Sequence, residues 1–286
     1  MAGKNERQRR QARERHRRQQ EQRVLRQQRI RRRWAIGTLA VLVAAGVGTL
    51  LLVFLPGGSA KKTSASASKS PSATASATAV AEPAHHCSYA SATPVAKKVS
   101  FPSATPDYTD SYQATLNTSQ GKITFNLLNN KATCTVNSFV HLAQAGYFDN
   151  TQCHRLLTSG IYVLQCGDAY ATATAKLDCS TTSKIGSGTP GYDFASENLK
   201  GVKYPAGTVA MANEGSATTN GSQFFIVFKD STSGLTASYT PFATVSSGLG
   251  IVQNVAKDGY SCQYAQSGGG APKKKVIIDS VTIKKT

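Results

Sequence analysis

GTVAMANEGSATTNGSQFFIVF, residues 207–228, is the stretch of the chain that decides the fold. It begins with a short apolar run, Val209–Met211, and ends with a second apolar run, Phe224–Phe228. A loop of small and polar residues, 213–222, lies between them. Apolar runs bounded by clusters of Gly, Asn and Ser predict two strands joined by a loop. Because small residues leave the backbone unhindered, we expect this loop to present its own N–H and C=O groups to an extended peptide.

Short strands and two helices are expected around this stretch. Apolar and polar residues alternate at 112–116 and 123–127, on either side of a turn at 118–121, which predicts a β-hairpin. Apolar residues at 136, 139, 140 and 143 predict a helix that begins at Thr133 or Thr135 as N-cap and ends near Gly146. Further strands are predicted at 153–157, 161–165, 208–211, 224–228, 242–245 and 276–283, and a second helix at 249–256. Many short strands with two helices indicate a mainly antiparallel barrel.

Two separate blocks of this sequence resemble the cyclophilins, which are peptidyl-prolyl cis/trans isomerases. One block is Met-Ala-Asn at 211–213 followed by Asn-Gly-Ser-Gln-Phe-Phe at 220–225, and the other is His-Arg at 154–155 followed by VLQCGD at 163–168. The resemblance extends from about residue 110 to residue 285. It implies a mainly β fold, a closed antiparallel eight-stranded barrel capped by two helices, and it implies catalysis of X-Pro isomerisation.

Isomerisation of an X-Pro bond requires neither a metal nor a covalent nucleophile. Rotation about a peptide bond faces a barrier of about 18–20 kcal/mol because the C–N bond has partial double-bond character. The two isomers of an X-Pro bond are nevertheless close in energy. An enzyme therefore needs only to bind the twisted amide more tightly than either planar form. We expect no cofactor and no metal site.

The resemblance implies three catalytic residues: Arg155, Gln165 and Phe225. Arg155 is the only Arg after residue 33, and a guanidinium presents several donors in a fixed plane without losing its charge. One donor would reach the prolyl nitrogen as it pyramidalises, and another would hold the substrate carbonyl. Gln165 would orient Arg155, and Phe225 would line the proline pocket. From the residues alone, the alternatives are a surface Arg in a salt bridge, an exposed strand Gln and a core Phe.

The resemblance also implies a set of substrate-binding residues. These are Tyr162, Val163, Ala212, Asn213, Gln223, Leu235 and Tyr239. Tyr162, Val163 and Leu235 would line the proline pocket with Phe225. Ala212 and Asn213 would offer main-chain groups to the residue before proline, and Gln223 would bind substrate backbone. Tyr239 would either donate to a substrate carbonyl or only line the groove.

This sequence also departs from the family pattern at several positions. Gly234 stands where many relatives have Trp, which puts cyclosporin sensitivity in doubt. Glu214 replaces a small residue and adds a negative charge at the groove, and Cys166 replaces a Gly. The long loop 168–192 either shapes substrate preference or carries a disulfide. A binding module of the same fold, which recognises proline-containing segments without turnover, is therefore the alternative function.

Six cysteines follow residue 86, and they are expected to form up to three disulfides. Fifteen pairings are possible, of which we prefer one that joins Cys134 to Cys153. A nucleophilic pair of Cys153 and His154 is not expected, because neighbours in a strand point to opposite faces. The run 85–87, His-His-Cys, lacks further metal ligands, so we interpret it as unstructured chain with Cys87 available for a disulfide.

The net charge of +18 is concentrated at the N-terminus, where residues 1–33 contain 14 Lys or Arg and 3 Glu. Trp34–Leu55 has no charged residue over 22 positions, which at about 1.5 Å per residue spans roughly 33 Å and predicts one transmembrane helix. The positive-inside rule places 1–33 in the cytoplasm, where anionic lipid headgroups would bind it. A cleaved signal peptide is the alternative for the apolar segment. Nucleic acid as the partner of 1–33 is not expected.

The chain is therefore expected to have four segments: a basic cytoplasmic tail (1–33), a transmembrane helix (34–55), a disordered linker rich in Ser, Ala, Thr and Pro (56–109), and a cyclophilin-like domain (110–286). Everything after the apolar segment is then extracytoplasmic. We therefore expect a cell-membrane protein with one span, whose partners are proline-containing polypeptides. Its expected role is in the folding of secreted or cell-envelope proteins.

Overall fold

Residues 86–180, 182–264 and 268–286 are described by the computed structural model. The predicted basic tail 1–33, the predicted span Trp34–Leu55 and the linker up to residue 85 lie outside these residues. Within the part of the chain that is described, no helix has the length and apolar character needed to cross a membrane.

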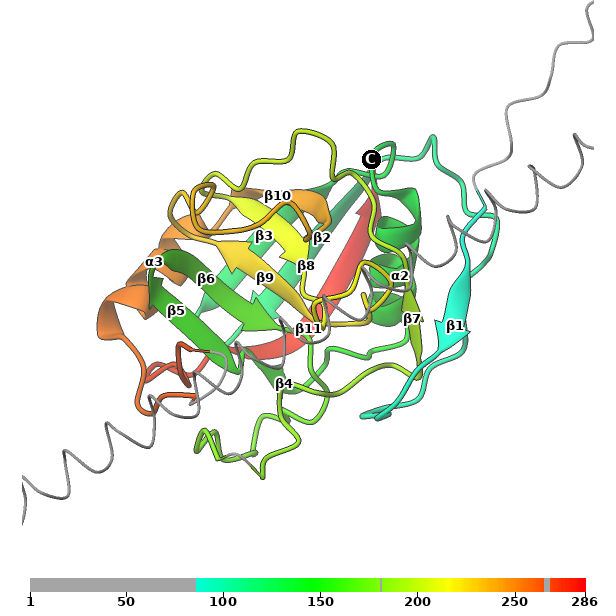
Figure 1. The fold of residues 1–286 in the computed structure, drawn as a ribbon. Helices are drawn as coiled ribbons and strands as arrows, with labels where there is room; N and C mark the ends of the chain where they lie inside the picture. The colour runs from blue at the N-terminus through cyan, green and yellow to red at the C-terminus, as the bar shows by residue number, and fades with distance from the viewer. Residues whose placement is uncertain (1–85, 181, 265–267) are drawn as a thin grey trace, which may run out of the picture. The chain divides into compact units, whose positions relative to one another are not determined.

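Nine antiparallel strands form one curled sheet (Figure 1). In sheet order they are β4 (Thr151–Gln152), β11 (Ile277–Lys285), β2 (Tyr112–Thr118), β3 (Gly121–Leu127), β10 (Pro241–Ser247), β8 (Thr208–Met211), β9 (Phe224–Val227), β6 (Ile161–Cys166) and β5 (Arg155–Ser159). The sequence predicts eight of these strands. The strand that it misses is β4, which has only two residues and therefore gives no periodic signal. Among the described residues no strand pair joins the edge strands β4 and β5, so the predicted closed barrel is not confirmed.

The predicted hairpin is strands β2 and β3, and it shows how alternation decides which face is buried. Ala114 pairs with Phe125 and Leu116 pairs with Ile123, and all four side chains are buried. The residues between them point to the other face and are more exposed. The sequence alternation therefore gives the correct hairpin and the correct core face.

Both predicted helices are confirmed, as α2 (Thr133–Gln144) and α3 (Leu249–Asp258). In Figure 1 they lie at opposite sides of the curled sheet. Helix α2 buries Phe139, whose ring contacts those of Phe148, Phe224 and Phe242 with centroid distances of 5.3, 5.6 and 5.1 Å. This aromatic cluster attaches α2 to the main core.

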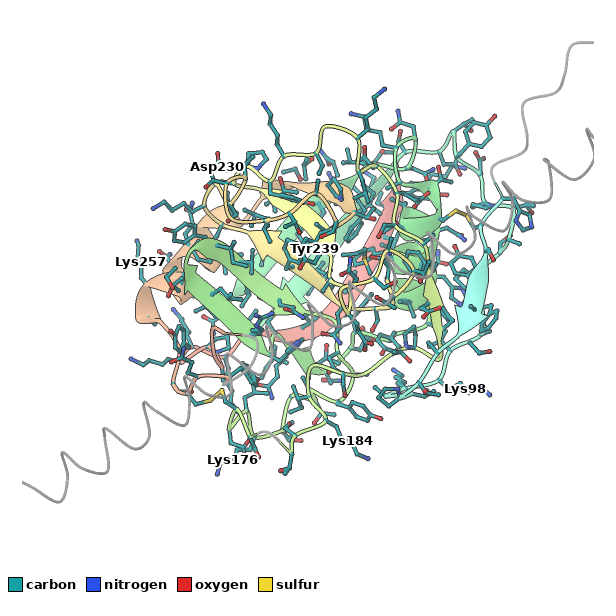
Figure 2. All side chains as sticks on the ribbon, viewed as in Figure 1. Lys98, Lys176, Lys184, Asp230, Tyr239 and Lys257 are labelled. Carbon is teal, nitrogen blue, oxygen red and sulfur yellow. A yellow bond between two sulfur atoms is a disulfide. The ribbon has the colours of Figure 1, made fainter. Side chains whose placement is uncertain are left out.

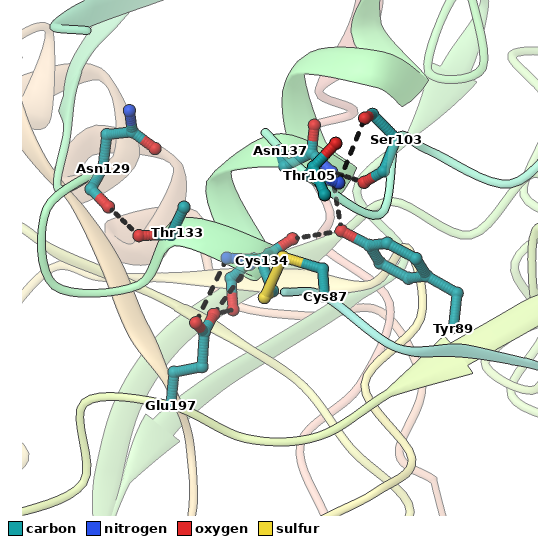
Figure 3. The surroundings of a disulfide bond; sticks show 10 residues. Cys87, Tyr89, Ser103, Thr105, Asn129, Thr133, Cys134, Asn137 and Glu197 are labelled. Atoms are coloured by element: carbon teal, nitrogen blue, oxygen red, sulfur yellow. Dashed lines mark hydrogen bonds between the residues drawn. A yellow bond between two sulfur atoms is a disulfide. The ribbon is translucent and has the colours of Figure 1, made fainter. Parts of the chain in front are cut away.

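The N-terminus of α2 is capped by a residue from a distant loop (Figure 3). The Glu197 carboxylate accepts hydrogen bonds from the N–H groups of Cys134 and Thr135, at 3.1 and 2.8 Å, and from the Thr135 hydroxyl at 2.7 Å. The residue at the N-cap position is Ala132, which has no side-chain acceptor. The prediction that Thr133 or Thr135 caps the helix is therefore wrong. A carboxylate at this position accepts hydrogen bonds from two N–H groups that have no partner within the helix, and its negative charge interacts favourably with the helix dipole. Such a cap stabilises the folded protein by about 1 kcal/mol.

Residues 86–109 carry structure that the linker prediction for 56–109 does not include. Strand β1 (Tyr89–Ser91) pairs antiparallel with β7 (Tyr192–Phe194) in a separate two-stranded sheet. The Tyr89 ring contacts the rings of Tyr192 and Phe194, at centroid distances of 5.5 and 5.7 Å. A segment of Ser, Ala, Thr and Pro has no hydrophobic periodicity, so its sequence gives no sign of this packing. We refer to residues 87–101 as the strap.

Three disulfides use all six cysteines: Cys87–Cys134, Cys153–Cys166 and Cys179–Cys262. The preferred pairing of Cys134 with Cys153 is therefore wrong. Strands β5 and β6 pair with Arg155 opposite Gln165, which brings the Cα atoms of Cys153 and Cys166 to 4.0 Å. Cys134, in the first turn of α2, is bonded to the buried Cys87 of the strap (Figure 3).

Candidate active site

A chain of hydrogen bonds holds Arg155 at the start of β5. Its Nε donates to the Gly268 carbonyl at 3.0 Å, and its Nη1 donates to Gln165 Oε1 at 3.1 Å. Gln165 Nε2 donates in turn to Gln223 Oε1 at 3.0 Å, and Gln223 Nε2 donates to the Gly188 carbonyl at 3.3 Å. We call this the polar chain. Each amide accepts from one neighbour and donates to the next, so the orientation of every member is fixed.

The Arg155 guanidinium is half-buried, and both of these acceptors are neutral. Neither hydrogen bond therefore neutralises its charge. Burial lowers the pKa of Arg155, and the side chains of Tyr239 and Tyr264 act against that shift. A guanidinium stays protonated despite such a shift. The site therefore contains a fixed cation in partly desolvated surroundings, where its interactions are stronger than in water.

A small apolar cluster, which we call the niche, lies beside the polar chain. Its buried members are Leu157, Val163, Tyr204, Ala210, Phe225 and Val227, and Ile161, Val202, Ala212, Leu235 and Tyr239 pack against them. Phe225 on β9 is paired with Gln165 on β6 and with Ala210 on β8, which places the niche next to the polar chain. The rings of Phe225 and Tyr239 are 5.5 Å apart in an edge-to-face arrangement.

The structure brings together nine of the ten site residues that the sequence predicts. Arg155, Gln165 and Gln223 form the polar chain, and Val163, Ala212, Phe225, Leu235 and Tyr239 form part of the niche, with Asn213 next to Ala212. Tyr162 lies elsewhere. Because it precedes Val163 in strand β6, it points to the opposite face, where it contacts Phe228 and packs against the main core.

The main chain at Ala212 and Asn213 is arranged to receive a peptide. The Asn213 side chain is fixed by bonds to the Ser238 carbonyl at 2.8 Å and from the Gly215 N–H at 3.0 Å. The Ala212 N–H donates to the Gln223 carbonyl at 2.9 Å. Within the described residues, the N–H and C=O of Asn213 have no backbone partner. These two groups are therefore open to an extended ligand.

Gly234 has no room for a side chain. A Cβ atom at this position would lie 2.4 Å from the Gly160 carbonyl oxygen and 2.6 Å from Ile161 Cγ2. The loop that carries Leu235 therefore packs directly on the β5–β6 turn, and the glycine is required by that close approach. Tyr239, whose backbone is held by the Tyr204 hydroxyl, remains the aromatic residue over the middle of this face (Figure 2).

The segment that follows Cys262, for which the sequence predicts no role, positions Arg155 on the side away from Gln165. Gly270 exchanges two backbone hydrogen bonds with Leu156, at 2.8 and 2.9 Å, which places the Gly268 carbonyl beside Arg155. The Tyr264 hydroxyl donates to the His154 carbonyl at 3.0 Å. The segment is held by the Cys179–Cys262 disulfide. Its only signals in the sequence are Cys262 and the Gly-rich run at 268–270.

Asp168 also organises the site, although no role was predicted for it. Its buried carboxylate accepts hydrogen bonds from the N–H groups of Tyr170, Gly186 and Gly188. It thereby folds the long loop back on itself, so that the Gly188 carbonyl can end the polar chain. A carboxylate with several N–H donors is a stable arrangement inside a protein.

His154 is fully buried beside Arg155, and neither of its ring nitrogens has a hydrogen-bond partner within the described residues. Burial lowers the pKa of its imidazole, so the ring is neutral near pH 7. No group of His, Cys, Asp or Glu in the described part of the chain is arranged to hold a metal ion. Cys87 is bonded to Cys134 and is not a free thiolate ligand.

Comparisons with known proteins show the family of the chain. Residues 113–283 match the model of the family described as cyclophilin type peptidyl-prolyl cis-trans isomerase/CLD. A probable peptidyl-prolyl cis-trans isomerase B of Mycobacterium leprae is 42% identical over 217 residues, which are 69% of this chain and 66% of that protein. A protein of the same name from Mycobacterium tuberculosis is 40% identical over 205 residues, 65% of this chain and 60% of that protein. Both matches cover less than two thirds of the relative's length.

Among solved structures, a cyclophilin type peptidyl-prolyl cis-trans isomerase of Cryptosporidium parvum aligns with a TM-score of 0.48 and 23% identity, covering 62% of this chain and 99% of that chain. The family match covers more than half of the 286 residues. The chain therefore belongs to the cyclophilin-type peptidyl-prolyl cis-trans isomerase family.

Replacing His154 with Gln should weaken the loss of stability at acidic pH. Because burial lowers the pKa of His154 in the folded state, the unfolded state binds more protons as the pH falls below about 6.5. The stability contributed by the neutral ring is complete above that pH and is lost below it. We expect the parent to lose about 1–2 kcal/mol more than the variant between pH 7.5 and pH 5. Urea unfolding at both pH values measures this difference, and parallel losses in the two proteins would contradict it.

Proposed function

We propose that the chain catalyses cis/trans isomerisation of X-Pro bonds in polypeptides. The observation that carries this proposal is the polar chain that holds the Arg155 guanidinium beside the apolar niche. The match of residues 113–283 to the family supports it. The niche has the apolar character that a proline ring requires, and the neighbouring cation is the electrostatic element that a twisted amide requires.

The proposed mechanism uses positioning and charge. The proline ring enters the niche against Phe225, and the main chain of Asn213 binds the residue before it. As the C–N bond twists, the prolyl nitrogen loses its conjugation and becomes a hydrogen-bond acceptor. Arg155 donates to this nitrogen and so stabilises the twisted amide over both planar forms. Gln165 keeps the guanidinium in place, so little reorganisation is needed during the reaction.

The alternative is a binding module of the same fold, which would hold proline-containing segments without accelerating their exchange. Tyr239, Gly234 and Glu214 favour it, because each departs from the residue usual in the family. Exchange NMR on an X-Pro peptide distinguishes the two functions. A binding module would broaden or shift peptide signals while the cis/trans exchange rate stays at its uncatalysed value.

Replacing Arg155 with Ala should lower kcat/KM for X-Pro isomerisation by about 100-fold, the usual cost of removing a donor that acts in the transition state. Arg155→Lys should also be poor, because an ammonium lacks the planar set of donors that reaches Gly268, Gln165 and the substrate together. A protease-coupled assay and exchange NMR on the same peptide measure both effects.

The matched control for these variants is Lys257→Ala, which removes an exposed cation from α3 at the edge of the domain (Figure 2). Its activity should equal that of the parent. An Arg155→Ala protein with parental activity, and with unchanged circular dichroism, would exclude the proposed role of Arg155.

We further propose that the chain is anchored in the cell membrane by Trp34–Leu55, with 1–33 in the cytoplasm near anionic lipid, and that its substrates are secreted or cell-envelope proteins. The uncharged 22-residue segment supports this proposal, and so do three disulfides, which are typical of oxidising compartments. Protease added to intact cells should remove the domain from the membrane fraction. Full protection of a soluble chain with free thiols would contradict the proposal.

A further inference from the structure

A pocket of about 90 Å³ lies at the end of the polar chain away from Arg155. The side chains of Gln165 and Gln223 form part of its wall, together with residues of the loop 212–223 and the segment 186–189. Ala92 and Thr93, which belong to the strap, also line it. The pocket therefore adjoins Asn213, where the peptide main chain is expected to bind, and it shares only Ala212 with the niche around Phe225.

The strap wall is fixed by main-chain hydrogen bonds. The Ala92 N–H donates to the Gly191 carbonyl at 3.1 Å, and the Ala96 N–H donates to the Thr189 carbonyl at 3.0 Å. In return, the Thr189 N–H donates to the Pro94 carbonyl at 2.9 Å, and its hydroxyl donates to the same oxygen at 3.0 Å. Thr93 is thus held between two bonded positions, next to the pocket.

The strap is also fixed at its beginning. The Cys87–Cys134 disulfide joins it to α2, and the Tyr89 hydroxyl donates to the Cys134 carbonyl at 3.0 Å (Figure 3). The family match begins at residue 113, so the strap lies outside the matched region. The pocket wall formed by Ala92 and Thr93 is therefore an addition to the family domain in this chain.

The charged residues that line the pocket are all acidic. Asp193 on β7 and Glu214 on the loop 212–223 both line it, and none of its described lining residues is basic. Neither carboxylate has an ion-pair partner among the described side chains. Burial also raises the pKa of Asp193, as expected for a carboxylate without a nearby cation. This acidic pocket occurs in a chain whose residues after 33 carry an excess of Lys over Asp and Glu.

We propose that the strap, Asp193 and Glu214 together form a substrate subsite that selects a cationic side chain, Lys or Arg, immediately before the X-Pro pair. The inference rests on the proposed isomerase function and assigns it a substrate preference. The X residue lies at Asn213, so the preceding side chain is the one that reaches a pocket bordering Asn213 on the side away from Phe225. The volume suits the end of a long side chain, and the carboxylates suit its charge.

Three peptides that differ only at the position before X-Pro test the preference: Lys, its uncharged analogue norleucine, and Glu. With the full-length protein in detergent micelles at low salt, kcat/KM for Lys should exceed that for norleucine by about threefold to fivefold, the range for one partly exposed ion pair. Glu should be the slowest. In a double variant, Asp193→Asn with Glu214→Gln, the ratio of Lys to norleucine should fall to about one. Asp230→Asn, an exposed acid outside the pocket (Figure 2), should keep the parental ratio.

The contribution of the strap is tested by Thr93→Lys, which places a cation in the pocket wall. Thr93 is exposed, and no hydrogen bond of its side chain is seen in the described structure, so the variant should fold. We expect its preference for the Lys peptide over the Glu peptide to fall, because the new cation offsets one of the two carboxylates. Thr105→Lys makes the same substitution at an exposed position outside the pocket and should keep the parental ratio.

The outcomes separate the subsite from the isomerase proposal. Equal kcat/KM for the Lys and norleucine peptides, with turnover that still depends on Arg155, would overturn the subsite and leave the isomerase intact. The same ratio of kcat/KM for the Lys and Glu peptides in Thr93→Lys and Thr105→Lys would exclude the strap from the subsite. Turnover of none of the three peptides would overturn the isomerase proposal itself.

Discussion

The hydrogen bonds that hold the Arg155 guanidinium are the constraint on which the site depends. A free arginine side chain has many rotamers, and fixing it costs conformational entropy. Here one side is held by the Gly268 carbonyl and the other by Gln165, which is itself held by Gln223. The register of β5 with β6 places Gln165 opposite Arg155. The segment at 268–271, which is bonded to Leu156, places the Gly268 carbonyl on the other side. The remaining structure serves to keep these partners in place.

Disulfides tie down three parts of the domain around the curled sheet. Cys87–Cys134 holds the strap, Cys153–Cys166 joins the strands that carry Arg155 and Gln165, and Cys179–Cys262 links the long loop to the segment that supplies Gly268. These segments bury few apolar side chains of their own. A disulfide contributes typically 2–4 kcal/mol, mainly by restricting the unfolded chain, so it can order a loop that packing alone would leave loose. The same cross-links therefore support both Arg155 and the wall of the acidic pocket.

The regular elements could be predicted from the sequence because they depend on local patterns, and most of the site could be predicted through the resemblance to the cyclophilins. Alternation gives the hairpin of β2 and β3, helical spacing gives α2, and the resemblance carried by two short blocks implies the predicted residues of the polar chain and the niche. Predictions were wrong or missing where a contact joins distant positions. The cap of α2 comes from Glu197, the partner of Cys134 is Cys87, and the Arg155 acceptor is Gly268. No local signal in the sequence encodes such pairings. Tyr162 was assigned with Val163 although alternation in β6 separates them.

The central claim is that a fixed guanidinium and an apolar niche act on the same X-Pro bond, and a structure of the protein with a bound X-Pro peptide tests it most directly. We expect the proline ring against Phe225 and an Arg155 nitrogen about 3 Å from the amide before it, with the bonds to Gly268 and Gln165 retained. An Arg155 side chain turned away from the peptide onto an acidic residue, or a proline bound outside the niche, would contradict the claim.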